Sequence, residues 1–179
     1  MAFVNFGIDK FKNYFGHPAR PTLFVVSLAF PANTRITWEE KDSFMCKGAQ
    51  LPSRSIGIIE LSYMGRKAKF AGDSVFDAWT IQIYNDQGFY IKNKLETWAE
   101  VINGARNNIS ATQLDDYKAT ATVKQLSGTG ETLKQYTMIG LVPTSTGDAI
   151  DMSWDNNDSA EEYSVTFEMD YWETSPITQ

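Results

Sequence analysis

The clearest pattern in the chain is an alternation of apolar and polar residues with a period of two. Near the C-terminus, apolar side chains at 163, 165, 167, 169 and 171 alternate with serine, threonine, glutamate and aspartate. Successive side chains of a strand point to opposite faces, so this pattern predicts a strand over 163–171 with one buried face. We expect Phe167 and Tyr171 to lie in the core.

Other segments predict further strands by alternation or by residue type. Alternation predicts strands over 79–84 and 150–155 and places Trp79 and Ile81 in the core. The segment 23–30 is apolar on both faces, which is typical of a central or covered strand. β-branched and aromatic residues predict four more strands, over 55–64, 67–71, 119–126 and 132–141.

Glycine-bearing turns join these four strands into two long hairpins. The first hairpin turns at Met64-Gly65-Arg66 and the second at Ser127-Gly128-Thr129-Gly130. Glycine allows the positive φ values that hairpin turns require. The second turn lacks the following Lys-Ser or Lys-Thr of a phosphate-binding loop, so we interpret it as a turn.

One amphipathic helix is predicted over 89–102, because apolar residues recur there at helical spacing. These residues are Ile91, Leu95, Trp98 and Ile102. Asn85-Asp86 precedes the helix as a cap region, and Gly104 follows it as a stop. We expect the apolar stripe, with Trp98, to pack on a sheet.

The order of elements predicts a mainly β protein: an antiparallel sandwich or barrel with one flanking helix. No internal repeat or long linker divides the 179 residues, so we expect one domain over 1–179. Residues 1–18 are expected to form an N-terminal arm and residues 174–179 a C-terminal tail.

Charge and composition narrow the classes of function. The net charge is −6, and no basic residue follows Lys134. The basic cluster Arg66, Lys67 and Lys69 is too small to neutralise a run of phosphates, which disfavours tight nucleic-acid binding.

No apolar run reaches the roughly 20 residues of a membrane span, and residues 1–15 lack a signal-peptide pattern, so we expect a soluble, unsecreted protein. A single cysteine, Cys46, predicts a reducing compartment and an apolar filling role.

Candidate catalytic and metal-binding residues are few. His17 is the only histidine, and with one cysteine a zinc site is disfavoured. The acidic segment 155–158 has alanine where a calcium loop needs its sixth-position glycine, so we interpret it as a polar turn. The paired carboxylates at 115–116 and 161–162 point to opposite faces if they lie in strands, unlike a glycosidase pair. We therefore predict no enzymatic activity, no metal and no cofactor.

Several short motifs follow one another along the chain. They are 19–24 (ARPTLF), 46–52 (CKGAQLP), the run 64–86 with Gly65-Arg66-Lys67, Ala71-Gly72-Asp73, Phe76-Asp77 and Asn85-Asp86, then 140–144 (GLVPT), Gly147, Trp154-Asp155 and 169–173 (MDYWE). In this order they resemble the tail tube proteins of contractile-tailed bacteriophages. The likeness runs from about residue 19 to residue 173, and two departures stand out: the segment 30–43, expected to form an enlarged surface loop, and the tail beyond 173.

The resemblance implies subunits that form stacked hexameric rings around a hollow lumen, with hairpins pairing between neighbours into one β-barrel. It implies a virion protein assembled in the host cytoplasm, with a sheath, a tape measure protein, baseplate and terminator proteins and passing DNA as partners. Related alternatives are a tube-initiating baseplate protein and the ring protein of type VI secretion. An alternative of another class is a small-ligand β-barrel binder.

These implications assign expected roles to individual residues. For intersubunit hairpins, supplied by 48–71 and 119–142, we expect Gly57, Ile58, Ile59, Leu61, Tyr63, Met64, Gly65, Arg66, Lys67, Thr122, Lys124 and Gln135. Glu60 and Ser62 share a strand face and are the lumen candidates, because an acidic or neutral lining would not hold passing DNA. Asp73 and Asp77 are assigned to a turn or an inter-ring contact. Lys92, Glu96 and Glu100 are expected on the outer, sheath-facing side of the helix.

Overall fold

The computed structural model describes residues 7–16, 18–150, 152–155 and 158–175 of the chain. No helix in these ranges is long and apolar enough to span a membrane. In chain order the elements are α1 (Ile8–Phe15), β1 (Phe24–Ala29), η1 (Ala32–Thr34), α2 (Glu40–Met45), β2 (Cys46–Ala49), β3 (Arg54–Tyr63), β4 (Arg66–Phe76), β5 (Trp79–Tyr84), α3 (Tyr90–Ile102), η2 (Leu114–Asp116), β6 (Ala119–Leu126), β7 (Thr132–Pro143), β8 (Glu162–Glu168) and β9 (Tyr171–Ser175).

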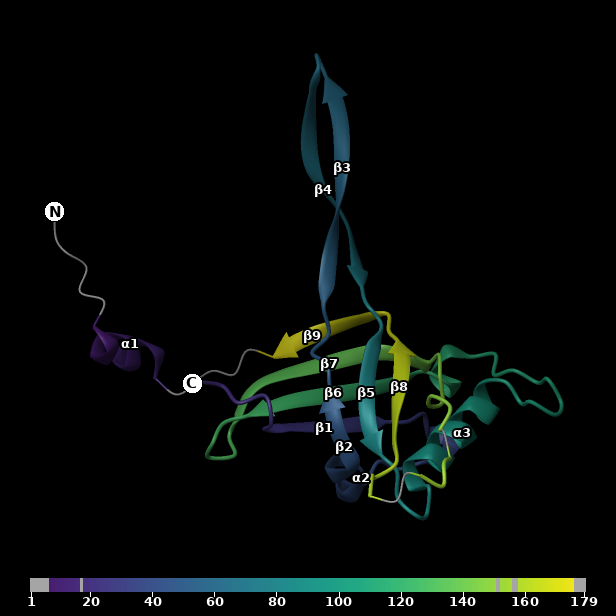
Figure 1. Cartoon of the computed structure of the whole chain (residues 1–179). Coiled ribbons are helices and arrows are strands. Elements are labelled where there is room, and N and C mark those ends of the chain that lie inside the picture. Colours follow the sequence, from purple (N-terminus) through teal and green to yellow (C-terminus); the bar gives the residue numbers. More distant parts are fainter. Residues whose placement is uncertain (1–6, 17, 151, 156–157, 176–179) are drawn as a thin grey trace.

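Seven antiparallel strands build the body of the molecule. They follow the order β1-β6-β7-β8-β5-β2, and β9 also pairs with β7. In Figure 1, β1, β6, β7 and β9 run across the view, whereas β5 and β8 cross them in front and α3 lies to one side. The strand β7 belongs to both sets, because its middle pairs with β9 and its end, Val142 and Pro143, pairs with β8.

The core lies between the two sets of strands. It takes one residue in two from β5 and β8, including Trp79, Ile81 and Phe167, each at most 1% exposed. Trp98 of α3 stacks on Phe167 with 6.1 Å between ring centroids, and its indole nitrogen donates to the carbonyl oxygen of Tyr117 at 2.7 Å. The alternation of apolar residues therefore predicted the core side of these strands, and the helical stripe predicted the packing of α3.

The C-terminal pattern was interpreted partly wrongly. The alternation over 163–171 spans two strands, because the chain turns at Met169 and Asp170 and β9 then pairs with β7 instead of β5. Tyr171, expected in the core, is 40% exposed at the start of β9. The predicted tail also begins too early, since Thr174 and Ser175 pair with Tyr136 and Gln135.

The strand predicted over 150–155 is absent from its described residues. Met152 is 86% exposed and Trp154 is 98% exposed, so their apolar character does not mark a core face. Residue 151 lies outside the described ranges.

The segment 30–43, expected to be a surface loop, packs against the body instead. Phe30 contacts Trp98 edge-on at 5.3 Å, and the indole of Trp38 donates to the carbonyl oxygen of Val26. Asp42 is fully buried at the start of α2, where it accepts from the amide of Glu39 and pairs with Lys94 at 2.5 Å. Removing either partner of a buried ion pair is costly, so this pair fixes α2 against α3.

Candidate assembly surface

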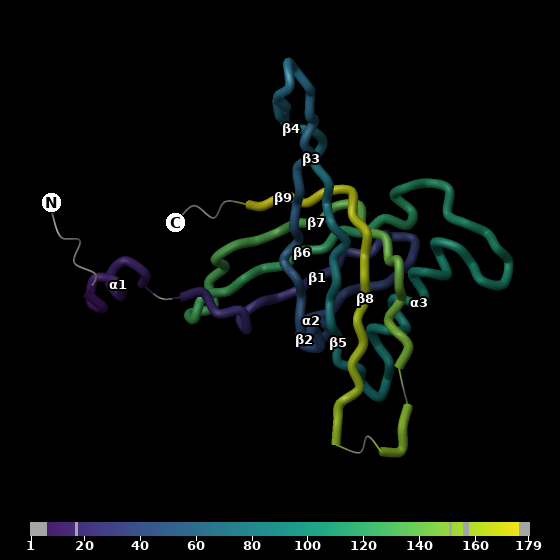
Figure 2. The backbone as a smooth tube through the Cα atoms, turned by 45° about the horizontal axis from the view of Figure 1, so that its top comes forward, coloured from purple at the N-terminus to yellow at the C-terminus, as the bar shows by residue number. Residues whose placement is uncertain are grey.

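The hairpin β3–β4 projects away from the body of the molecule. Figures 1 and 2 show it standing clear of the other strands. In the described part of the chain, β3 and β4 pair only with each other and form a separate two-stranded sheet. All ten residues of β3 are exposed. A hairpin of two strands is marginal in water by itself, so this element needs a partner that the rest of the described chain does not supply.

The register divides the outer half of the hairpin into two unlike faces. Residues paired across strands share a face, and Ile59 pairs with Phe70, Leu61 with Ala68 and Tyr63 with Arg66. The apolar face, defined as Ile59, Leu61, Tyr63 and Phe70, keeps each of its side chains more than half exposed. Covering such a side chain contributes about 1.5–3 kcal/mol, so the apolar face is a strong driving force for association.

The polar face contains Glu60 and Ser62, as the sequence predicted, together with Lys67 and Lys69. Lys67 lies 2.7 Å from Glu60 and Lys69 lies 3.8 Å from it. Two lysines therefore accompany one glutamate, and this face is net positive. The acidic or neutral lining expected from Glu60 alone does not describe this face.

Two glycines allow the strands to approach closely in the middle of the hairpin. A β-carbon added at Gly72 would lie 3.1 Å from the backbone of Gly57, where the register shifts between Ile56 and Ile58. Gly65 at the tip has φ of 78°, the left-handed region that favours glycine. Asp73 lies inside β4, so a turn at Asp73 is wrong, and the alternative of an inter-ring contact stays a prediction.

The base of the hairpin is fixed to the body by several contacts. The hydroxyl of Ser53 donates to the carboxylate of Asp77, and the indole of Trp172 donates to the carbonyl oxygen of Ser53 at 3.1 Å. Phe76 packs edge-on against Trp172 at 6.2 Å. Asp77 therefore closes the base of the hairpin, and the ribbon projects from an ordered anchor.

The second hairpin, β6–β7, is in a different environment. β6 pairs with β1 on one side and β7 on the other, so it has no free edge for a neighbour. The edge-to-edge pairing expected at Thr122 and Lys124 is therefore wrong for β6. Thr122, Lys124 and Gln135 are half-buried and share the sheet face opposite the core.

The outer side of α3 presents fewer free charges than expected. Glu96 is exposed, and Glu100 is exposed but accepts from the amide of Ala105 at 3.1 Å. Lys92 is half-buried, with its ammonium 5.6 Å from the ring centre of Tyr163. The helix begins as predicted near Asp86, whose carboxylate accepts from the amide of Tyr90.

Candidate catalytic groups do not form a site in the described residues. No three His, Cys, Asp or Glu side chains among them are placed to hold a metal ion. His17 and residues 156–157 lie outside the described ranges. Burial raises the pKa of the Cys46 thiol to about 12, which keeps it neutral and unreactive.

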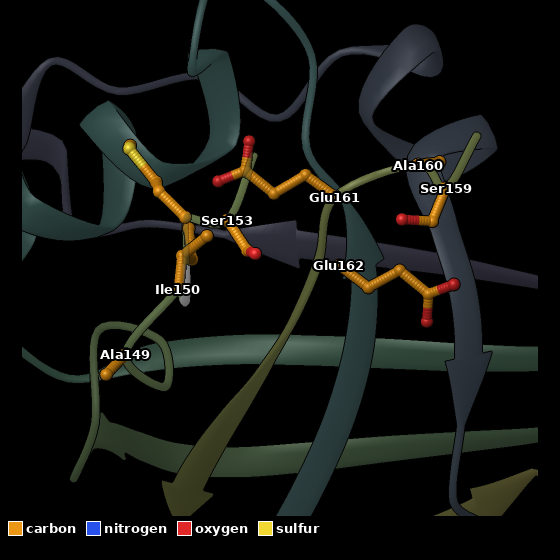
Figure 3. A pocket seen from close by; sticks show the side chains of 8 residues that line it. Ala149, Ile150, Ser153, Ser159, Ala160, Glu161 and Glu162 are labelled. Carbon is orange, nitrogen blue, oxygen red and sulfur yellow. The ribbon is translucent and has the colours of Figure 1, made fainter. Parts of the chain in front are cut away.

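Glu161 and Glu162 line a groove of about 540 Å³ with Ile150, Met152 and Ser159. Figure 3 shows their carboxylates pointing to opposite sides. Glu162 pairs with Lys47 at 2.5 Å. This geometry does not suit a pair of facing catalytic acids.

A filled core, an anchored ribbon with one apolar face and unpaired strand edges together define a structural subunit of an assembly. The family model described as "Phage tail tube protein" matches residues 19–175, and the chain belongs to this family. It is a phage tail tube protein.

Individual relatives agree with this assignment. The chain is 32% identical over 159 residues to the tail tube protein gp19 of Enterobacteria phage T4, covering 88% of this chain and 93% of that protein. Among solved structures, its fold matches a chain of the sheath-tube complex of the extracellular contractile injection system PVC in the extended state, with a TM-score of 0.63, 19% identity and coverage of 90% and 94%. It also matches a chain of the anti-feeding prophage baseplate, with a TM-score of 0.65, 12% identity and coverage of 92% and 99%.

Proposed function

We propose that this chain self-assembles into hexameric rings that stack into the inner tube of a contractile phage tail. The exposed β3–β4 hairpin carries this proposal. An apolar ribbon with two free edges is a liability in a monomer, but a closed ring of identical subunits pairs the edges and covers the apolar face. Cyclic symmetry then limits further growth to the stacking direction.

The polar face of the hairpin is the proposed lumen side. The face with Ile59, Leu61, Tyr63 and Phe70 goes against a neighbouring subunit, which leaves Glu60, Ser62, Lys67 and Lys69 toward the interior. The face of β6–β7 opposite the core, with Thr122, Lys124 and Gln135, is proposed to face the lumen as well. It would extend the lining with a sheet face and not with a strand edge. Pairing of Glu60 with two lysines leaves few free positive charges per subunit, which suits a conduit that DNA must leave quickly.

The proposed partners follow from the tube. We expect a sheath around the tube and a baseplate at its start, because the matched chains come from a sheath-tube complex and from a baseplate. A tape measure protein in the lumen and a terminator at the far end complete the set, and assembly takes place in the host cytoplasm. Glu96 of α3 is the proposed sheath contact, because it is exposed and has no ion-pair partner within 4.0 Å among the described residues.

We propose no catalytic role. A small-ligand barrel would keep an interior cavity, whereas here Trp79, Trp98 and Phe167 occupy the space between the strands with their rings in contact.

Replacing residues 57–73 by a two-residue Asn-Gly turn, which joins the paired residues Ile56 and Ser74, tests the function. This segment contributes no residue to the core, so we expect a folded protein that forms no tubes in negative-stain electron microscopy. The matched control, Ser62→Ala, changes the polar face only and should leave tubes intact. Normal tubes from the shortened chain would refute the proposal.

A further inference from the structure

The helix α1 has an apolar stripe that the rest of the described chain leaves exposed. Ile8, Phe11 and Phe15 recur at helical spacing and are 63%, 58% and 58% exposed. The rings of Phe11 and Phe15 stack at 5.2 Å, and no residue of α1 is buried. In both Figure 1 and Figure 2, α1 stands apart from the sheets, beyond the β6–β7 turn and away from α3.

An eight-residue helix is not stable by itself in water, so α1 requires a surface that covers its stripe. The match to the tail tube family begins at residue 19, after α1. The likeness to the family therefore does not account for this helix.

A second uncovered apolar surface lies in the acidic segment between β7 and β8. Met152 and Trp154 are 86% and 98% exposed, and Met152 lines the groove of Figure 3. In the same groove, Oε1 of Glu161 is buried and has no hydrogen-bond partner among the described residues. A buried carboxylate oxygen without a partner is costly, so a small movement of the groove that brings a donor to Glu161 is favoured.

The two surfaces are complementary in charge. Residues 1–18 carry Lys10 and Lys12 against Asp9, a net charge of +1, and the rest of the chain carries −7, since the whole carries −6. Lys12 borders the apolar stripe, four residues after Ile8, whereas Lys10 lies on the opposite side of the helix. An ammonium beside the stripe therefore suits the unpartnered oxygen of Glu161.

The two surfaces lie at different sides of the same molecule, α1 beyond the β6–β7 turn and the groove beside α3. Complementary surfaces at different places on one subunit make a head-to-tail contact that repeats from copy to copy.

We propose that α1 is an intersubunit arm: its stripe packs on Met152 and Trp154 of a second copy of the chain, and Lys12 pairs with Glu161 of that copy. This contact rests on the proposed self-assembly, and it adds a link between subunits that is separate from the β3–β4 hairpin.

Cysteine cross-linking of assembled tubes tests the contact directly. In the full chain carrying Cys46→Ala, the pair Ile8→Cys and Met152→Cys should form intermolecular disulfides under mild oxidation, seen as a ladder of multimers on a non-reducing gel. The control pair, Asn13→Cys and Met152→Cys, places the thiol on the opposite side of α1 and should give at most a tenth of this yield. Equal yields from the two pairs, or no ladder from the first pair, would overturn the proposal.

Charge reversal tests the ion pair independently. Lys12→Glu should raise the protein concentration needed for tube formation about tenfold, which corresponds to 1.4 kcal/mol, and Lys10→Glu should change it less than twofold. Adding Glu161→Lys to Lys12→Glu should restore the original concentration. If Lys12→Glu and Lys10→Glu assemble alike, the arm does not dock in this way, although tubes still form. A wild-type chain that forms no tubes at all would instead defeat the proposed function.

Discussion

The two long hairpins have the same local sequence character but opposite surroundings. Both combine β-branched and aromatic residues with a glycine-bearing turn, yet β6–β7 is enclosed by β1 and β9, whereas β3–β4 stands free. In β6 the core-facing residues are Ala119, Ala121 and Val123, which are small and buried. In β3 the corresponding residues of the apolar face are Ile59, Leu61 and Tyr63, which are large and exposed. The comparison shows that one hairpin stabilises the subunit, whereas the other is available to stabilise contacts between subunits.

The largest expected effect separates assembly from folding. Leu61→Ser combined with Phe70→Ser removes two large side chains from the apolar face, worth about 3–6 kcal/mol per subunit if both are covered in the tube. We expect the concentration needed for tube formation to rise at least about a hundredfold. The thermal unfolding midpoint of the unassembled subunit should not change. A fall in that midpoint with unchanged assembly would reverse the roles of the two hairpins.

The counterpart in the second hairpin is Met138→Ala. Met138 is fully buried opposite Ala121, so its truncation leaves a cavity and should lower the free energy of unfolding by about 2–5 kcal/mol. Urea unfolding monitored by tryptophan fluorescence measures this loss. The control Thr137→Ala changes the neighbouring residue on the opposite face and should cost less than about 1 kcal/mol.

These two hairpins also show how far the sequence alone could lead. Alternation and residue type predicted both hairpins, most of the core and the position of α3, because those patterns follow from local geometry. They could not distinguish a large apolar residue that is exposed on the subunit from one that packs in its core, and the strand expected at Met152 and Trp154 failed for this reason. The sharp turn at Asp170 was missed because the alternation continues through it.

For some site residues, the strand face was predicted correctly but the neighbouring side chains were not. The sequence predicted that Glu60 and Ser62 share a face, because residues two apart in a strand point to the same side. The closeness of Lys67 and Lys69 to Glu60 depends on the register between β3 and β4, which the sequence does not give. The burial of Asp42 against Lys94 also could not be predicted, because these residues are distant in sequence and the segment around Asp42 has a polar surface-loop composition.

A smaller effect is expected on the polar face of β3–β4. Glu60→Lys changes that face from two lysines and one glutamate to three lysines, and exposed ion pairs contribute only about 0–1 kcal/mol, so tubes should still form. Phosphate contacts strengthen with each added positive charge, so DNA ejection from virions should slow and become more dependent on salt. An unchanged ejection rate would place Glu60 away from the lumen.

The smallest effect is expected outside both hairpins, at α3. Glu96→Lys should leave bare tubes intact and weaken the binding of sheath protein in co-sedimentation, because repeated weak charge contacts add along the tube. Thr97→Ala, at the adjacent exposed position, serves as the control. Loss of the tubes themselves would make Glu96 a contact within the tube.

Electron microscopy of the purified chain over a range of concentrations tests most directly whether copies of the protein complete one another's exposed strands. The account predicts hollow tubes with sixfold symmetry above a threshold concentration, and β3–β4 of each subunit covered by a neighbour in the reconstruction. Single subunits at every concentration and salt, or tubes in which β3–β4 remains uncovered, would contradict it.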